Sequence, residues 1–193
     1  MSRSRRRGAD LEAAIHEAVI EQLSSHTYSE LTFEGVAAAA ATSKAVLYRR
    51  WSTKAEMVMT AVAHTKARAI AAPDNGSLRA DLIGLLRSGR DTFTETTRRT
   101  MLGVLADIGP DSSTMMRDWM FARTGEIVDP LLRRARDRGE LGPTTIPPRA
   151  AALPLDLLRH ETLLRGSLDD SDIADLVDQC LVPLYQSLSG SKF

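Results

Sequence analysis

The chain has 193 residues, of which 43% are hydrophobic and 26% are charged, and its formal net charge is zero. This composition is typical of a globular protein and excludes a disordered chain, a collagen-like chain and a highly charged tail protein. No stretch carries the roughly 18 to 20 uncharged apolar residues that a membrane-spanning helix needs, so we expect a soluble, cytoplasmic protein that does not contact a membrane.

Aromatic residues make up only 5% of the chain and runs of β-branched residues are absent, which favours an all-helical fold. The net charge of zero hides an asymmetry: residues 1–72 carry 10 Lys or Arg against 7 Asp or Glu, whereas residues 73–193 carry 15 against 18. The charge balance changes sign at Pro73-Asp74-Asn75-Gly76, a strong turn signal. We therefore predict two domains, residues 1–72 and residues 73–193.

Apolar residues recur at helical spacing through four segments of the first domain. Thr32 and Ser43 precede the second and third of these segments, where a side-chain hydroxyl can accept a hydrogen bond from an unpaired backbone N–H. Ser52 and Thr53 are predicted to end the third helix and to cap the fourth. The predicted helices span residues 8–25, 33–40, 44–51 and 54–72.

Five further segments of the second domain show the same recurrence, separated by Gly-rich and Pro-rich breaks, so the chain is predicted to form about nine helices. Pro130 and Pro154 fall inside two of these segments and are predicted to kink or split them. Cys180, the single cysteine, lies in an apolar stretch typical of a buried thiol and allows no internal disulfide. The predicted helices span residues 77–96, 98–108, 112–138, 148–165 and 171–188.

The third predicted helix has two different faces. Leu47 and Trp51 are four residues apart and are predicted to pack onto the first two helices. The opposite face carries basic, aromatic and small side chains, which suit the phosphates and base edges of a DNA major groove. Two short helices joined by a tight turn are the geometry that places the second helix in this groove. The alternative is a surface helix whose arginines are merely solvated.

The segment from Thr32 to Lys54 resembles the DNA-binding domain of the TetR family of bacterial transcriptional regulators. The resemblance rests on the opening threonine, Val36-Ala37, the turn at Ala41-Thr42-Ser43, the helix that ends in Tyr48, and Trp51. It implies contacts with base edges, the groove or phosphates, and the implied DNA-binding residues are Thr32, Ser43, Lys44, Ala45, Val46, Tyr48, Arg49, Arg50 and Lys54.

The chain departs from the family pattern at the turn, where Ala41-Thr42 replaces the usual Gly-Val. An alanine disfavours the left-handed conformation by roughly 1 kcal/mol or more, so we expect a differently shaped turn or a second helix that runs one residue longer. Four arginines precede the first helix, and they are expected either to reach a phosphate or the minor groove, or to form a solvated tail. They are Arg3, Arg5, Arg6 and Arg7.

The resemblance further implies that the second domain binds a small apolar or amphipathic effector and forms a homodimer through its last two helices. Both candidate sets have a simpler alternative, which is ordinary packing inside one protomer. The candidate effector-pocket residues are Phe93, Met101, Leu105, Met116, Trp119, Met120 and His160. The candidate dimer-interface residues are Leu153, Leu157, Leu164, Leu176, Cys180, Leu181 and Leu184.

An enzyme is not expected, because the four histidines are far apart in the sequence and there is no metal-binding spacing and no glycine-rich phosphate loop. We therefore predict no cofactor and no metal. The predicted function is a ligand-responsive transcriptional regulator, in the usual case a repressor, that binds a palindromic double-stranded DNA operator as a homodimer. The alternative is a helical protein-interaction module that does not bind DNA.

Overall fold

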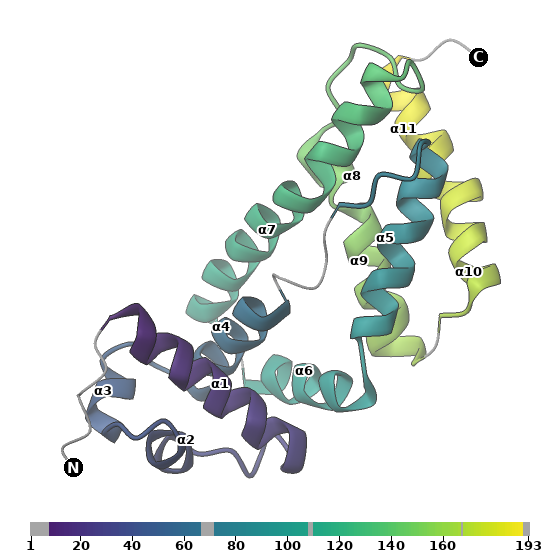
Figure 1. Cartoon of the computed structure of the whole chain (residues 1–193). Coiled ribbons are helices and arrows are strands. Elements are labelled where there is room, and N and C mark those ends of the chain that lie inside the picture. The colour runs from purple at the N-terminus through teal and green to yellow at the C-terminus, as the bar shows by residue number, and fades with distance from the viewer. Residues whose placement is uncertain (1–7, 67–71, 108–109, 167, 191–193) are drawn as a thin grey trace. The chain divides into compact units, whose positions relative to one another are not determined.

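The structure is a computed structural model that describes residues 8–66, 72–107, 110–166 and 168–190; the side chains of residues 63, 65, 66 and 110–123 lie outside this description. The described residues form helices and no strands, as the composition predicts (Figure 1). The chain divides into two compact units. The first contains Met1–Arg68 and Glu95–Ser112, and the second contains Ala69–Thr94 and Ser113–Phe193.

The first unit is built on a long amphipathic helix, α1, which packs against α4 and α2, while α2 packs against α3. Its core consists of aliphatic side chains that recur at helical spacing, among them Ile15, Val19, Val36, Leu47 and Met57, each with no exposed surface. The helices of this unit are α1 (Ala9–Ser25), α2 (Phe33–Ala39), α3 (Lys44–Tyr48), α4 (Lys54–Lys66) and α6 (Glu95–Asp107).

The place of α6 differs from the predicted domain division. The sequence assigns residues 73–193 to the second domain, but α6 packs against α4 and α1 of the first unit. The ring of Tyr28 fills the space beside Gly103, where a Cβ atom would lie only 2.6 Å from Tyr28 Cδ1. This close approach depends on a glycine in the middle of α6, a position where glycine otherwise weakens a helix.

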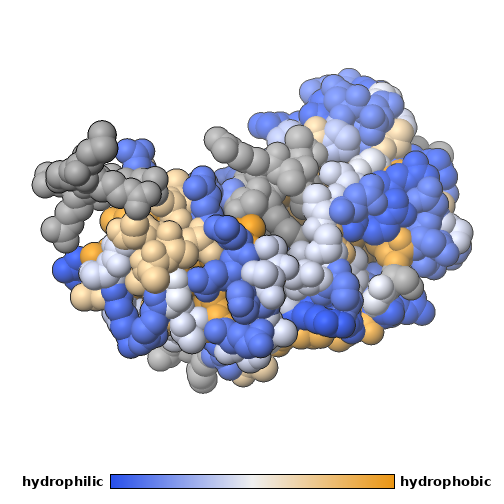
Figure 2. All heavy atoms as spheres, turned by 60° about the horizontal axis from the view of Figure 1, so that its bottom comes forward, coloured by the Kyte–Doolittle hydropathy of each residue, from blue (hydrophilic) through white to orange (hydrophobic). Residues whose placement is uncertain are grey.

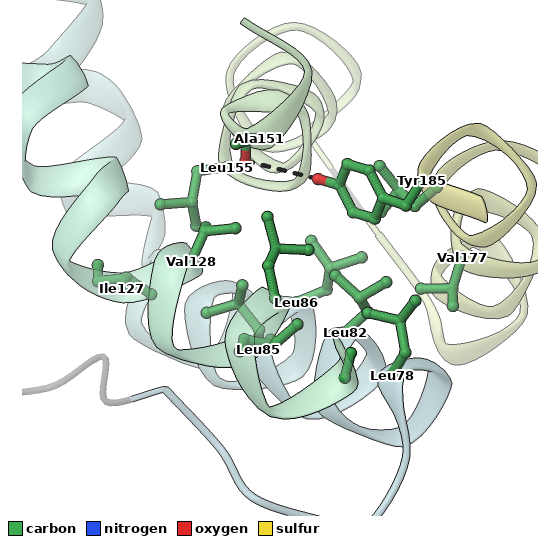
Figure 3. Close-up of a cluster of buried hydrophobic side chains, with 14 of the residues drawn as sticks. Leu78, Leu82, Leu85, Leu86, Ile127, Val128, Ala151, Leu155, Val177 and Tyr185 are labelled. Carbon is green, nitrogen blue, oxygen red and sulfur yellow. Dashed lines mark hydrogen bonds between the residues drawn. The ribbon is translucent and has the colours of Figure 1, made fainter. Parts of the chain in front are cut away.

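The second unit surrounds a leucine-rich core (Figure 3). Leu78, Leu82, Leu85 and Leu86 of α5 project into it, and Tyr185 lies at its edge with its hydroxyl donating to the backbone oxygen of Ala150 over 3.1 Å. The elements are α5 (Leu78–Thr92), α7 (Pro110–Asp137), α8 (Pro148–Ala151), α9 (Leu153–His160), η1 (Glu161–Arg165), α10 (Asp170–Asp175), η2 (Leu176–Leu181) and α11 (Val182–Ser189).

The two internal prolines behave differently. Pro154 is an early residue of α9, next to the break that separates α8 from α9, so the predicted split occurs there. Pro130 lies inside α7, which nevertheless continues from Pro110 to Asp137 without a split. Cys180 is exposed rather than buried, which corrects the prediction of a core thiol.

Candidate DNA-binding surface

The first of the two short helices, α2, begins as predicted. Thr32 has an extended backbone, and its Oγ1 accepts a hydrogen bond from the N–H of Gly35 over 3.1 Å. The glycine lets α2 approach α1 closely, because a Cβ atom at residue 35 would lie 3.2 Å from the side-chain amide of Gln22. Thr32 is therefore a structural cap, and it is exposed.

The turn between α2 and α3 keeps the left-handed residue that the sequence predicts to be disfavoured. Ala41 has a φ of 52°, and among the described residues it is the non-glycine residue with a positive φ. The N–H of Thr42 bonds to the oxygen of Ala37, and the N–H of Ala41 bonds to the oxygen of Ala38. This is the Schellman pattern that ends many helices. The two hydrogen bonds hold an alanine where glycine is usual, so the expected reshaping of the turn does not occur.

Helix α3 presents two faces, as its sequence predicts. Leu47 is fully buried and Trp51, which follows the helix, is 6% exposed, so both side chains pack into the core. On the opposite side Tyr48 is 50% exposed, and Lys44, Ala45 and Arg49 are also exposed. We call these four residues the α3 face. Val46, another predicted groove contact, is half-buried, and Ser43 lies at the cap position but makes no capping hydrogen bond through its side chain.

The ring of Tyr48, in the α3 face, packs against α2. Tyr48 stacks on Phe33 of α2 with ring centroids 4.4 Å apart and an interplanar angle of 21°. The ammonium of Lys44 lies 5.3 Å from the centroid of the Tyr48 ring. In the face that Figure 2 shows, hydrophilic and hydrophobic residues are interspersed. The stacking fixes the direction of the Tyr48 ring while half of its side chain stays open to a partner.

The basic side chains around α3 are partly engaged within the protein. Lys44 donates a hydrogen bond to Oε1 of Glu34, which raises the pKa of Lys44 and lowers the pKa of Glu34. The guanidinium of Arg50 donates to Oε2 of Glu12 over 2.9 Å. The side chain of Arg49 makes no hydrogen bond or ion pair with any residue that the structure describes. The sequence analysis did not identify the two carboxylates, because their pairing depends on how three helices pack.

The start of α4 is a capping box. Thr53 Oγ1 accepts from the N–H of Glu56 over 3.1 Å, and the carboxylate of Glu56 accepts from the N–H of Thr53 over 3.3 Å. The predicted phosphate contact Lys54 donates to the backbone oxygen of Tyr28 over 3.0 Å and lies 4.2 Å from the Tyr28 ring centroid. Lys54 therefore has a structural contact, and its contact with DNA stays a prediction.

The predicted effector residues are divided between the two units, and three of their side chains are not described, so their shared pocket stays a prediction. Phe93 and His160 belong to the second unit, while Met101 and Leu105 lie on α6 in the first. The side chains of Met116, Trp119 and Met120 lie outside the described residues. The second unit does contain a pocket of about 410 Å³, but none of the predicted residues lines it. Its walls include Leu132, Arg133, Arg136, Ile146 and Ala152.

The predicted interface residues separate into two groups. Leu181 is 1% exposed and belongs to the core of its own protomer, which corrects its assignment to an interface. Leu164 is 68% exposed and Cys180 is exposed, whereas the remaining leucines are half-buried. These half-buried residues are Leu153, Leu157, Leu176 and Leu184. Most of the predicted set therefore keeps surface that a second chain can cover.

Two family profiles match the sequence. Residues 15–60 match the profile described as bacterial regulatory proteins, tetR family, and residues 72–180 match the profile described as Tetracyclin repressor-like, C-terminal domain. The chain is 32% identical over 185 residues to the DNA-binding transcriptional repressor TetR of Mycobacteroides abscessus, covering 93% of this chain and 96% of that protein. It is 28% identical to an uncharacterised helix-turn-helix transcriptional regulator of Mycobacterium tuberculosis, covering 93% and 90%.

Solved structures show the same fold. The TetR family transcription regulator SCO0332 superimposes with a TM-score of 0.75 at 28% identity and covers 89% of this chain and 97% of its own. The complex of SmeT with triclosan has a TM-score of 0.54 at 20% identity and covers 92% of each chain, so it shows the fold alone. None of the helices in the described part of the chain is long and apolar enough to cross a membrane.

Proposed function

Because this chain belongs to the tetR family of bacterial regulatory proteins, it is a DNA-binding transcriptional regulator rather than an enzyme, and we propose that the α3 face enters the major groove of its operator. Family membership also excludes the alternative of a helical module that does not bind DNA. The finer assignments below, which concern the operator, the dimer, the effector and the contact residues, are proposals.

The observation that carries the proposal is that the α3 face is exposed while Leu47 and Trp51, on the other side, are buried. Arg49 is exposed and without a partner among the described residues, so its guanidinium is available for guanine O6 and N7. The Tyr48 hydroxyl can reach a phosphate, and the methyl of Ala45 can contact a thymine methyl. Thr32, Ser43, Lys44, Val46, Arg50 and Lys54 complete the proposed DNA-binding set.

We further propose a homodimer that binds a palindromic operator. One short helix contacts too few bases for a specific site, and a two-fold dimer presents two copies about 34 to 36 Å apart, one turn of DNA. The exposed Leu164 and the half-buried leucines of the last two predicted helices favour a bundle with the same helices of a second chain. Such a protein acts where the chromosome is, which in a bacterium is the cytoplasm.

We also propose regulation by a small apolar or amphipathic effector that releases the protein from DNA, so that it acts as a repressor. A family relative of 32% identity is named a repressor, and a protein of the same fold has been solved with triclosan. Phe93, Met101, Leu105 and His160, with Met116, Trp119 and Met120, remain candidate effector-binding residues.

The test is a salt titration of DNA binding. Duplexes that tile the region upstream of the protein's own gene are measured by fluorescence anisotropy between about 50 and 200 mM salt. We expect one duplex to bind more tightly than the rest and its affinity to fall steeply with salt, because phosphate contacts release counterions. Absence of binding to every duplex at the lowest salt would contradict the proposed function.

A further inference from the structure

Two carboxylates lie beside the basic residues of α3. Glu34 of α2 accepts from Lys44, and Glu12 of α1 accepts from Arg50. Glu34 belongs to α2 and Glu12 to α1, whereas Lys44 begins α3 and Arg50 follows it, so each carboxylate reaches its cation from another segment of the chain. Arg49, between the two paired cations in the sequence, makes no such pair within the described residues. Internal acids thus engage two of the three cations of residues 44–50.

Stabilisation of the fold is a weak explanation for these pairs. The side chains of Lys44 and Glu34 are 45% and 61% exposed, and those of Arg50 and Glu12 are 31% and 48% exposed. Ion pairs this open to water contribute little to stability, since solvent screens the attraction and the side chains lose rotamer freedom. Their location matters more, because they lie where a polyanion is proposed to bind.

We propose that Glu34 and Glu12 are specificity-determining residues. They act as internal counterions for Lys44 and Arg50 and thereby weaken nonspecific binding to DNA. This inference rests on the proposed function. A phosphate that binds either cation competes with the carboxylate already paired to it, and that carboxylate then lies close to the DNA backbone and repels it. Nonspecific binding depends almost wholly on phosphate contacts, so this competition lowers the affinity for nonspecific DNA in full.

Binding to the operator depends less on these two cations. Base contacts through Arg49 set the register of α3 in the groove, so Lys44 and Arg50 meet only the phosphates that this register offers. On nonspecific DNA the protein can slide to any register in which a cation contacts a phosphate. Removing the internal counterions should therefore strengthen nonspecific DNA binding more than operator binding.

The experiment compares Glu34→Gln and Glu12→Gln with the wild type on a random-sequence duplex and on the tightest upstream duplex. For one added phosphate contact per copy of α3, each copy steepens the slope of log affinity against log salt by about 0.9 and raises the affinity at 0.15 M salt about five-fold. We expect this gain on the random duplex for each variant, and a gain of less than two-fold on the operator.

Glu17→Gln is the matched control, because Glu17 is an exposed carboxylate of α1 with no ion pair among the described residues and its replacement changes the net charge equally. Combining Glu34→Gln with Lys44→Gln should abolish the gain if Glu34 acts through Lys44. The inference is wrong if the wild type binds DNA while Glu34→Gln and Glu12→Gln keep the slope and affinity of Glu17→Gln. A wild type that binds no duplex overturns instead the proposed function on which the inference rests.

Discussion

The hydroxyl of Tyr28 donates a hydrogen bond to Oδ2 of Asp107 over 2.8 Å, although the two residues are 79 positions apart in the sequence. The bond joins the loop before α2 to the end of α6. Burial and the bond to Asp107 both raise the pKa of Tyr28, so its hydroxyl keeps its proton and donates throughout the physiological range. This contact and the close approach of Tyr28 to Gly103 add to the packing of α6 against α4 and α1 in the first unit.

Tyr28→Phe should lower the free energy of unfolding by about 1 to 2 kcal/mol, because it removes a hydrogen bond to a charged acceptor. Urea denaturation of Tyr28→Phe, Asp107→Ala and the double variant measures the loss as a double-mutant cycle. We expect a coupling energy of about 1 kcal/mol between the two positions. Strictly additive effects would mean that the bond does not contribute.

Ala41→Gly should stabilise the protein by about 0.5 to 1 kcal/mol. A left-handed conformation costs an L-residue about 1 to 2 kcal/mol, and the greater freedom of glycine in the unfolded chain offsets part of the gain. The control is Ala38→Gly, at an exposed position inside α2, which should instead destabilise by about 1 kcal/mol. If both variants lose stability, Ala41 is not under strain.

His16 should make stability depend on pH. Its ring is buried, and neither ring nitrogen has a hydrogen-bond partner within the described part of the chain. The pKa of His16 is lowered first by burial, then by His64 and Arg50, with Glu12 opposing them. In the unfolded chain His16 takes up a proton as the pH falls through about 6.5, whereas in the folded chain it does so only at lower pH. The free energy of unfolding therefore falls as the pH drops below about 6.5 and is retained above it.

Urea titrations at about pH 7.5 and 5.5 measure this dependence. In His16→Leu the loss of stability between the two pH values should be smaller than in the wild type, whatever the absolute stability of the variant. His26→Gln, at an exposed histidine, should keep the loss of the wild type. An unchanged loss in His16→Leu would contradict the assignment.

Leu164→Glu should dissociate the proposed dimer. Leu164 is 68% exposed in the protomer, so the substitution costs the monomer little. In the dimer it would bury an unpaired carboxylate at a cost of about 3 kcal/mol, which weakens association roughly 100-fold. Sedimentation equilibrium measures the change. Leu105→Glu is the control at another exposed leucine, 55% exposed on α6, and should leave association unaltered.

Local patterns were enough to predict the helix-turn-helix. The spacing of Leu47 and Trp51 predicts the buried side of α3, and both residues are buried. Ile173, Val177, Leu181 and Tyr185 also recur every four residues, and all four are buried in the core. That row was available in the sequence and shows why Leu181 is not an interface residue.

Contacts between distant segments were not predictable in the same way. The pairing of Glu12 with Arg50 and of Glu34 with Lys44 depends on the packing of α1, α2 and α3, which no single helix encodes. The sequence likewise leaves open whether Pro130 kinks or splits its helix, and α7 continues through it without a split although proline removes a helical hydrogen bond. Tertiary packing therefore decides the features that the sequence pattern missed.

The central claim is that the α3 face reads DNA, and Arg49 is the residue that tests it most directly. Binding of Arg49→Ala to the tightest upstream duplex, and to duplexes substituted at each base pair of one half-site, is compared with Arg133→Ala, which removes an exposed arginine from α7 of the second unit. We predict that Arg49→Ala loses about 1 to 3 kcal/mol of binding free energy and loses its preference at one position per half-site, while Arg133→Ala binds like the wild type. Unchanged affinity and unchanged base preference in Arg49→Ala would contradict the account.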